Sequence, residues 1–157
     1  MIPSDLISIL PVLILVACAL VLLLVDLWTS KQWPAVTPIL AVLGLTASLA
    51  SVLLLTEQQG TAFGGMLRVD GFSQFLCILF AATGILSIGL AYRYLSRITV
   101  HRGEYFVLLV FSISGMMLMS MAGDLIVVFL ALELLSIRLY ILAGLAQERI
   151  ESKEASL

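Results

Sequence analysis

Apolar runs of about 20 residues with almost no charged side chain fill most of this chain, and they constrain its fold more than any other feature. We expect five membrane-spanning helices, at about residues 6–27, 35–56, 71–92, 105–123 and 125–146. Hydrophobic residues make up 62% and charged residues 11% of the sequence, whereas soluble domains average about 45–50% and about 25%. The pattern excludes a soluble domain. It predicts an all-α membrane protein in which residues 1–157 form a single transmembrane domain.

The positively charged residues predict how these helices are oriented. Alternate connections carry six Lys and Arg residues on one side and one on the other, and Arg138 lies inside the fifth helix. The positive-inside rule therefore predicts an outside amino terminus and a cytoplasmic carboxyl terminus. The first run lacks a basic leader and a cleavage pattern, so we expect a retained helix and not a signal peptide. The six residues are Lys31, Arg93, Arg97, Arg102, Arg149 and Lys153, and the single one is Arg68.

Charge and cysteine content exclude further classes of function. The net charge of −2 leaves no basic stripe that could hold nucleic acid. The two cysteines, Cys18 and Cys77, both lie inside apolar runs and provide neither a disulfide framework nor metal-ligand spacing. We therefore expect no metal, no bound cofactor and no nucleic-acid partner for this chain.

Two of the connections differ from simple turns. Residues 57–70 form the longest one, which we expect to be a short hairpin or an irregular loop ending in a capping Asp70. The connection after the fourth helix is nearly absent, and Asp124 is placed to cap the fifth helix. Small residues such as Gly115 predict close packing of the fourth helix, and its methionines are interpreted as packing residues. Asp26 is interpreted as a solvated charge at the end of the first helix.

Glu133 is the most informative residue of the sequence. It follows Asp124 by nine positions, about 13–14 Å along a helix, and so lies near the middle of a hydrocarbon core about 30 Å thick. A carboxylate at this depth costs several kcal/mol unless it is paired or hydrated. The position favours a proton-binding group that faces the bundle interior or a water path. The alternative is a protonated Glu133 that makes one interhelical hydrogen bond.

Three further polar residues lie close to Glu133 in the sequence. Ser136 and Tyr140 share its helical face, where their hydroxyl groups could hold a short water chain or make ordinary interhelical hydrogen bonds. Arg138 lies about 140° around the helix from Glu133, so it is not a partner on the same face. We expect Arg138 either to pair across helices or to extend to the membrane interface.

The last third of the chain resembles a known family. The matching segments are GDL at 123–125, LELLS at 132–136, YILAG at 140–144 and SKEASL at 152–157, with MLRVDGFSQF at 66–75 as an earlier match. This sequence resembles subunit N of proton-translocating NADH-quinone oxidoreductase, which is the antiporter-like membrane subunit of bacterial respiratory complex I and a relative of mitochondrial subunit 2.

The resemblance implies a function for the whole subunit. It implies a multi-pass protein of the bacterial plasma (inner) membrane that contributes to proton translocation coupled to electron transfer from NADH to quinone. NADH and quinone are then used by the whole complex, and the partners are the lipid bilayer and other complex I membrane subunits. Glu133 matches the family's fifth-helix carboxylate, which works beside lysines on later, discontinuous helices. Arg138 departs from the family, which usually has Pro or a small residue there.

The resemblance also implies that the chain corresponds to the amino-terminal part of a larger multi-helix subunit. Such a portion has no catalytic centre of its own, and we expect it to be inactive in isolation. Two alternatives remain open. One is a related cation/proton antiporter or membrane-bound hydrogenase subunit. The other is a structural or assembly membrane protein without transport activity, in which Glu133 could be replaced by Gln with no loss of function.

Overall fold

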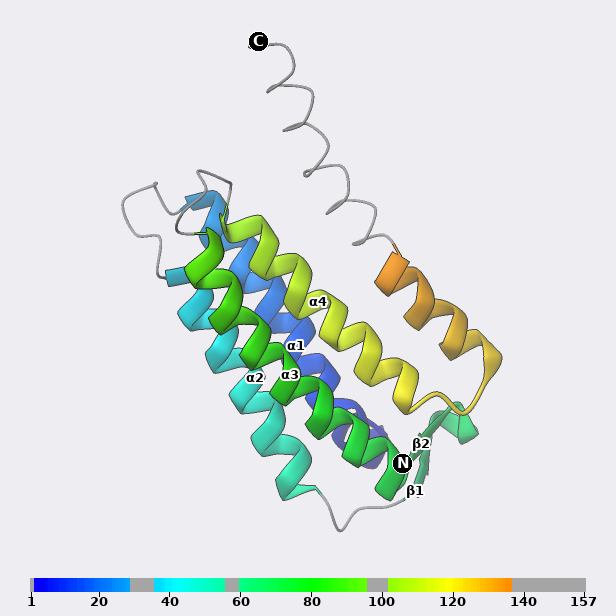
Figure 1. Cartoon of the computed structure of the whole chain (residues 1–157). Coiled ribbons are helices and arrows are strands. Elements are labelled where there is room, and N and C mark those ends of the chain that lie inside the picture. Colours follow the sequence, from blue (N-terminus) through cyan, green and yellow to red (C-terminus); the bar gives the residue numbers. More distant parts are fainter. Residues whose placement is uncertain (1, 29–35, 56–59, 96–101, 137–157) are drawn as a thin grey trace.

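The computed structural model describes residues 2–28, 36–55, 60–95 and 102–136. Four long helices follow one another along the described chain, and a shorter helix, Leu125–Ser136, comes after them (Figure 1). The all-α class is confirmed. The long helices are α1 (Ile2–Trp28), α2 (Val36–Leu54), α3 (Gly71–Leu95) and α4 (Arg102–Ser120).

The helix boundaries agree closely with the predicted spans. Helix α3 begins at Gly71 as predicted, whereas α4 begins and ends three residues earlier than the predicted 105–123. The four long helices are all long and apolar enough to cross a membrane. The fifth predicted span is described only as far as Ser136, and its remainder lies outside the described residues.

The long helices form an up-and-down bundle (Figure 1). Helix α1 packs against α2 and α4, and α3 packs against the same two helices. Large apolar side chains fill the centre, and a buried serine joins the helices: the Ser48 hydroxyl donates to the Pro11 carbonyl at 2.9 Å. The most deeply buried large side chains are Leu15, Leu22, Leu45, Ile88, Phe106 and Met117.

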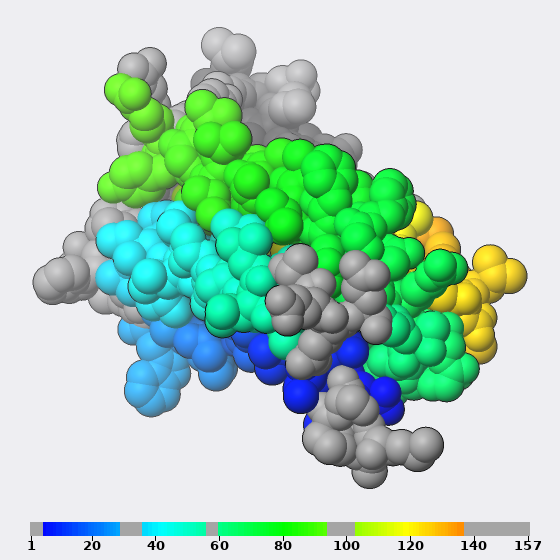
Figure 2. Space-filling model, turned by 90° about the horizontal axis from the view of Figure 1, so that it is seen from below, coloured from blue at the N-terminus to red at the C-terminus, as the bar shows by residue number. Residues whose placement is uncertain are grey.

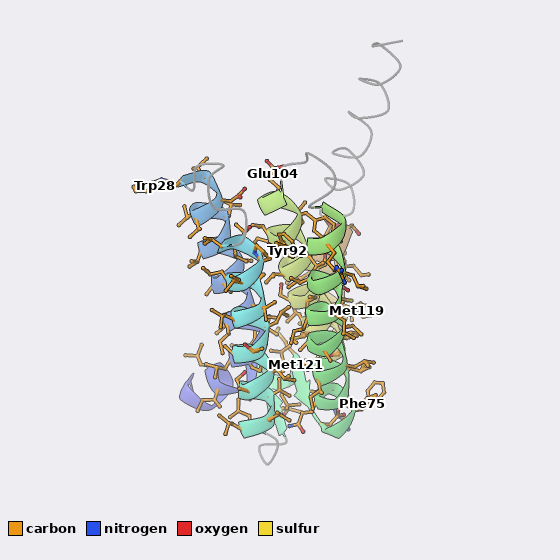
Figure 3. The ribbon with its side chains drawn as sticks, turned by 60° about the vertical axis from the view of Figure 1, so that its left-hand side comes forward. Trp28, Phe75, Tyr92, Glu104, Met119 and Met121 are labelled. Carbon is orange, nitrogen blue, oxygen red and sulfur yellow. The ribbon has the colours of Figure 1, made fainter. Side chains whose placement is uncertain are left out.

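The outer surface of the bundle is apolar as well. Trp28 and Phe75 point away from the bundle near its opposite ends (Figure 3), and their exposed fractions are 89% and 60%. Aromatic side chains at both ends of a set of apolar helices are typical of the two membrane–water interfaces. This surface is suited to a lipid environment and not to water.

The connection that precedes α3 is a β-hairpin, one of the two structures expected for it. Strands β1 (Gly60–Ala62) and β2 (Leu67–Val69) pair antiparallel, with Thr61 opposite Arg68. A 3₁₀ turn, η1 (Phe63–Gly65), joins the strands, and Gly64 and Gly65 adopt φ values of 66° and 96° there. Glycine suits both positions because other residues rarely adopt positive φ.

The hairpin is hydrogen-bonded to the turn that follows α4. The Arg68 N–H donates to the Met121 carbonyl, and the Gly123 N–H donates to the Met66 carbonyl, each at 2.8 Å. Leu67 and Ala122 form an antiparallel bridge between the two segments. Figure 2 shows this end of the molecule, with the hairpin against the yellow atoms that follow α4. The hairpin therefore fixes the position of the 121–124 turn, from which the helix Leu125–Ser136 starts.

Candidate functional site around Glu133

The helix that carries Glu133 starts at the cap that the sequence predicts. The Ile126 N–H donates to Asp124 Oδ1 at 3.2 Å, and the Val128 N–H donates to the Asp124 carbonyl at 3.1 Å. The carboxylate thus satisfies one of the free N–H groups of the first turn. The predicted capping role of Asp124 is confirmed.

The same helix packs on α4 at Gly115. A methyl group placed at Gly115 would lie 3.3 Å from Leu134 Cβ and 3.4 Å from both the Ala131 carbonyl oxygen and Leu135 Cγ. Ala131 is fully buried. The close approach predicted from the small residues of α4 is confirmed, and it fixes which face of the helix Leu125–Ser136 points into the bundle.

Glu133 lies on the opposite face of this helix. It is two positions from Ala131, about 200° around the helix axis, and its side chain is exposed. Phe129 and Leu130 lie one turn earlier on the same face, with exposed fractions of 61% and 52%, and Ile126 lies one turn before them. The carboxylate therefore stands within an apolar surface that no other described element covers.

The structure describes one of the three polar neighbours predicted for Glu133. Ser136 is half-buried and lies three positions after Glu133, as helical spacing requires. Arg138 and Tyr140 lie outside the described residues. The grouping of Glu133 with Ser136, Arg138 and Tyr140 therefore stays a prediction.

Asp26 occupies a different setting from the solvated helix end proposed for it. It is half-buried, and its carboxylate packs directly against Gly103 in the first turn of α4, where a Cβ atom would overlap it. Figure 3 shows these helix ends at the same end of the bundle, with Trp28 of α1 and Glu104 of α4 both labelled there. A carboxylate is disfavoured at the C-terminus of its own helix but favoured at the N-terminus of another. The interpretation of Asp26 as a solvated charge is therefore wrong.

Asp70 has the capping role expected for it. The Ser73 N–H donates to Asp70 Oδ1, and the Asp70 N–H donates to the Ser73 hydroxyl oxygen, each at 2.9 Å. The Ser73 N–H bond lowers the pKa of Asp70 below its usual value, and the charge of the nearby Arg68 lowers it further. Asp70 is thus an ionised structural residue at the start of α3.

Two methionines of the segment 116–121 have the packing role proposed for them, whereas Met119 is exposed on the outer face of α4. Met117 is fully buried in the bundle, and Met121 is almost so, at the end that carries the hairpin. Met117 lies within the reach of Ser48, whose hydroxyl oxygen is 3.8 Å from the Met117 sulfur. Flexible thioether side chains of this kind fill irregular core space.

Comparison with known proteins identifies relatives of this chain. NADH-quinone oxidoreductase subunit N of Chloroflexus aggregans is 44% identical over 156 residues, which are 99% of this chain and 32% of that protein. NADH-quinone oxidoreductase subunit N 2 of Roseiflexus castenholzii is 40% identical over 139 residues, which are 88% of this chain and 28% of that protein. No family model matches the sequence. The chain thus spans about a third of the length of these curated relatives.

A comparison of folds finds a solved structure of the same kind of protein. A chain of respiratory complex I from Thermus thermophilus with bound aureothin is 30% identical and superposes with a TM-score of 0.70. The match covers 85% of this chain and 28% of that one. Sequence and fold therefore point to the same group of membrane proteins.

Proposed function

Because the chain belongs to the subunit N family of NADH-quinone oxidoreductases, we propose that it acts in the membrane arm of respiratory complex I. In this role it contributes to proton translocation coupled to electron transfer from NADH to quinone. NADH and quinone are reactants of the whole complex and are not bound by this chain. Its partners are the lipid bilayer and other membrane subunits, and its location is the bacterial plasma membrane.

The observation that carries this proposal is the setting of Glu133. The structure places Glu133 on an exposed apolar face, and the sequence predicts that this face lies near mid-depth. A carboxylate in such a place is too costly to leave in contact with lipid. Its face therefore needs a polar partner or a water-filled path, supplied by protein that packs over the helix Leu125–Ser136. A carboxyl group in such a place can accept a proton from one side of the membrane and release it toward the other. This proton transfer is the role of Glu133.

The proposal is tested first by asking which proteins the chain assembles with. We expect an affinity-tagged chain, expressed from its own locus and extracted in mild detergent, to co-purify with NADH-oxidising activity. A tag on an unrelated multi-pass protein of the same membrane is the control, and it should bring down none. Recovery of the tagged chain free of NADH-oxidising activity would contradict membership of the complex.

The orientation of the bundle is a separate part of the proposal. The hairpin, the start of α3 and the 121–124 turn share one end of the bundle, whereas α1 and α3 end, and α2 and α4 begin, at the other end (Figure 1). The uneven distribution of Lys and Arg supports placing the hairpin end outside the cell.

We expect Thr61→Cys to react with a membrane-impermeant maleimide in intact cells and Ser96→Cys to react only after the membrane is opened. Thr61 lies exposed in the hairpin, and Ser96 lies in the basic connection after α3. Labelling should be measured in a background that lacks Cys18 and Cys77. Strong labelling of Ser96→Cys in intact cells would reverse the proposed orientation.

A further inference from the structure

A groove runs along the outer face where α3 meets α4, next to the hairpin. Its volume is about 490 Å³, which is within the range of ligand-sized pockets. Phe72, Leu76 and Phe80 line it from α3, and Met116 and Met119 line it from α4. Aromatic and thioether side chains form an adaptable apolar wall, which suits a flexible hydrocarbon chain.

The depth of the groove places it inside the membrane. Phe72 and Phe80 are eight residues apart in α3, which corresponds to about 12 Å along the helix axis. The candidate membrane span of α3 begins at Gly71, so the groove starts at the membrane boundary and descends into the hydrocarbon layer. An acyl chain that enters from the boundary can follow the groove for most of the depth of one leaflet.

A pair of opposite charges stands at the boundary end of the groove. Arg68 Nε lies 3.3 Å from Asp70 Oδ2, and both residues line the groove. The Arg68 side chain is 70% exposed. Since this ion pair uses Nε, the donors at the two terminal guanidinium nitrogens remain available for an oxyanion. Asp70 adds a carboxylate beside it.

We propose that this groove binds a phospholipid with an ethanolamine headgroup. The lipid phosphate contacts the Arg68 guanidinium, the primary ammonium contacts the Asp70 carboxylate, and one acyl chain lies between α3 and α4. The adjacent positive and negative groups match a zwitterionic headgroup. A purely anionic headgroup would place its charge against Asp70, and a choline headgroup has no N–H to donate to it. This site does not depend on the proposed role of Glu133.

Photo-crosslinking tests what occupies the groove. With p-benzoylphenylalanine in place of Phe80 in the full chain, irradiated in its native membrane, we expect an adduct with the mass of a phospholipid. The same substitution at Leu90, exposed near the other end of α3, is the control for general lipid contact. A Phe80 adduct with protein would show that another helix covers the groove, and it would overturn the proposal.

Lipid selectivity tests the headgroup. The protein is purified in detergent with whatever subunits accompany it, incubated with equal amounts of phosphatidylethanolamine, phosphatidylcholine and phosphatidylglycerol, and analysed by native mass spectrometry. We expect phosphatidylethanolamine to be retained preferentially, and Arg68→Gln to lower its retention about tenfold, the loss of about one charge-assisted hydrogen bond. Arg93→Gln removes the same charge at the other end of α3 and should change nothing. Leu76→Trp, which fills the groove, should also lower retention.

Two results would overturn the headgroup assignment. One is equal or better retention of phosphatidylcholine or phosphatidylglycerol by the unmodified protein. The other is the same phosphatidylethanolamine retention in Arg68→Gln as in the unmodified protein. Arg68 is largely exposed and lies in a two-stranded hairpin held by backbone hydrogen bonds, so Arg68→Gln should fold.

Discussion

Glu133→Gln, introduced into the subunit within the assembled complex, should lower proton translocation severalfold while NADH oxidation with an artificial electron acceptor is unchanged. Gln keeps the size of the side chain and its hydrogen bonding but does not titrate, so it removes proton transfer without removing packing. The measurement is the quenching of a pH-sensitive dye in inverted membrane vesicles, compared with the NADH oxidation rate in the same vesicles.

The matched control for this change is Glu104→Gln. Glu104 is exposed in the first turn of α4, at the far end of the bundle from the hairpin, and we place it outside the proton path. Proton translocation by Glu104→Gln should equal that of the unmodified complex. An unchanged ratio of protons to electrons in Glu133→Gln would contradict the proton-transfer role and favour a purely structural glutamate.

A second substitution at Glu133 distinguishes whether its helix face is covered by protein or faces lipid. Glu133→Leu would be tolerated or stabilising if the face met lipid, because apolar helix surfaces suit hydrocarbon. If the face is covered by a polar partner, Leu leaves that partner unsatisfied at a cost of about 1–3 kcal/mol. We therefore expect Glu133→Leu to lower the yield of assembled complex, as measured by native gel electrophoresis.

The positions of the helices could be predicted from the sequence because the bilayer sets their length. A run of apolar residues about 20 long has few alternatives to a spanning helix, and the helix ends follow from local chemistry. Asp70 and Asp124 illustrate this: each caps a helix through a hydrogen bond to an N–H two or three residues later. Such contacts are local in the sequence, so the sequence pattern is sufficient to predict them.

The contacts between distant segments could not be predicted in the same way. The half-buried setting of Asp26 depends on Gly103, which is 77 positions away, and the Ser48–Pro11 hydrogen bond spans 37 positions. Neither pair has a distinctive spacing. A glycine in the first turn of a helix, such as Gly103, and a serine inside an apolar run, such as Ser48, are consistent with a contact. They do not identify the residue that makes it.

The position of Glu133 along its helix could be predicted, whereas the direction it faces could not. Helical rise gives the distance between Glu133 and its N-cap, Asp124, directly from their separation in the sequence. The direction depends on which face packs on α4, and Gly115 decides this by allowing Ala131 and Leu134 to approach. The polarity of Glu133 alone would suggest that it faces the interior of the described bundle, yet the structure places it on the opposite face.

Gly123→Ala should be among the most destabilising single-methyl changes in the described part of the chain. A Cβ atom at Gly123 would overlap the carbonyl oxygen of Gly65 and lie 3.3 Å from that of Met66. Both are backbone atoms of the hairpin, which cannot rotate away as a side chain can. The overlap also disturbs the Gly123 N–H bond to the Met66 carbonyl. We expect the free energy of unfolding to fall by about 2–3 kcal/mol, measured by thermal denaturation in detergent.

Gly123→Ala should also change the position of Glu133, because the two residues are connected through the backbone. The 121–124 turn joins the hairpin to the helix Leu125–Ser136, so a displaced turn shifts that helix along α4 and moves the carboxylate from its depth. Proton translocation by assembled Gly123→Ala complexes should therefore fall as well. Gly89→Ala is the matched control, since a Cβ atom there meets nothing within 4 Å, and it should leave stability and translocation unchanged. If Gly123→Ala proved as stable and active as Gly89→Ala, the hairpin would have no part in positioning Glu133.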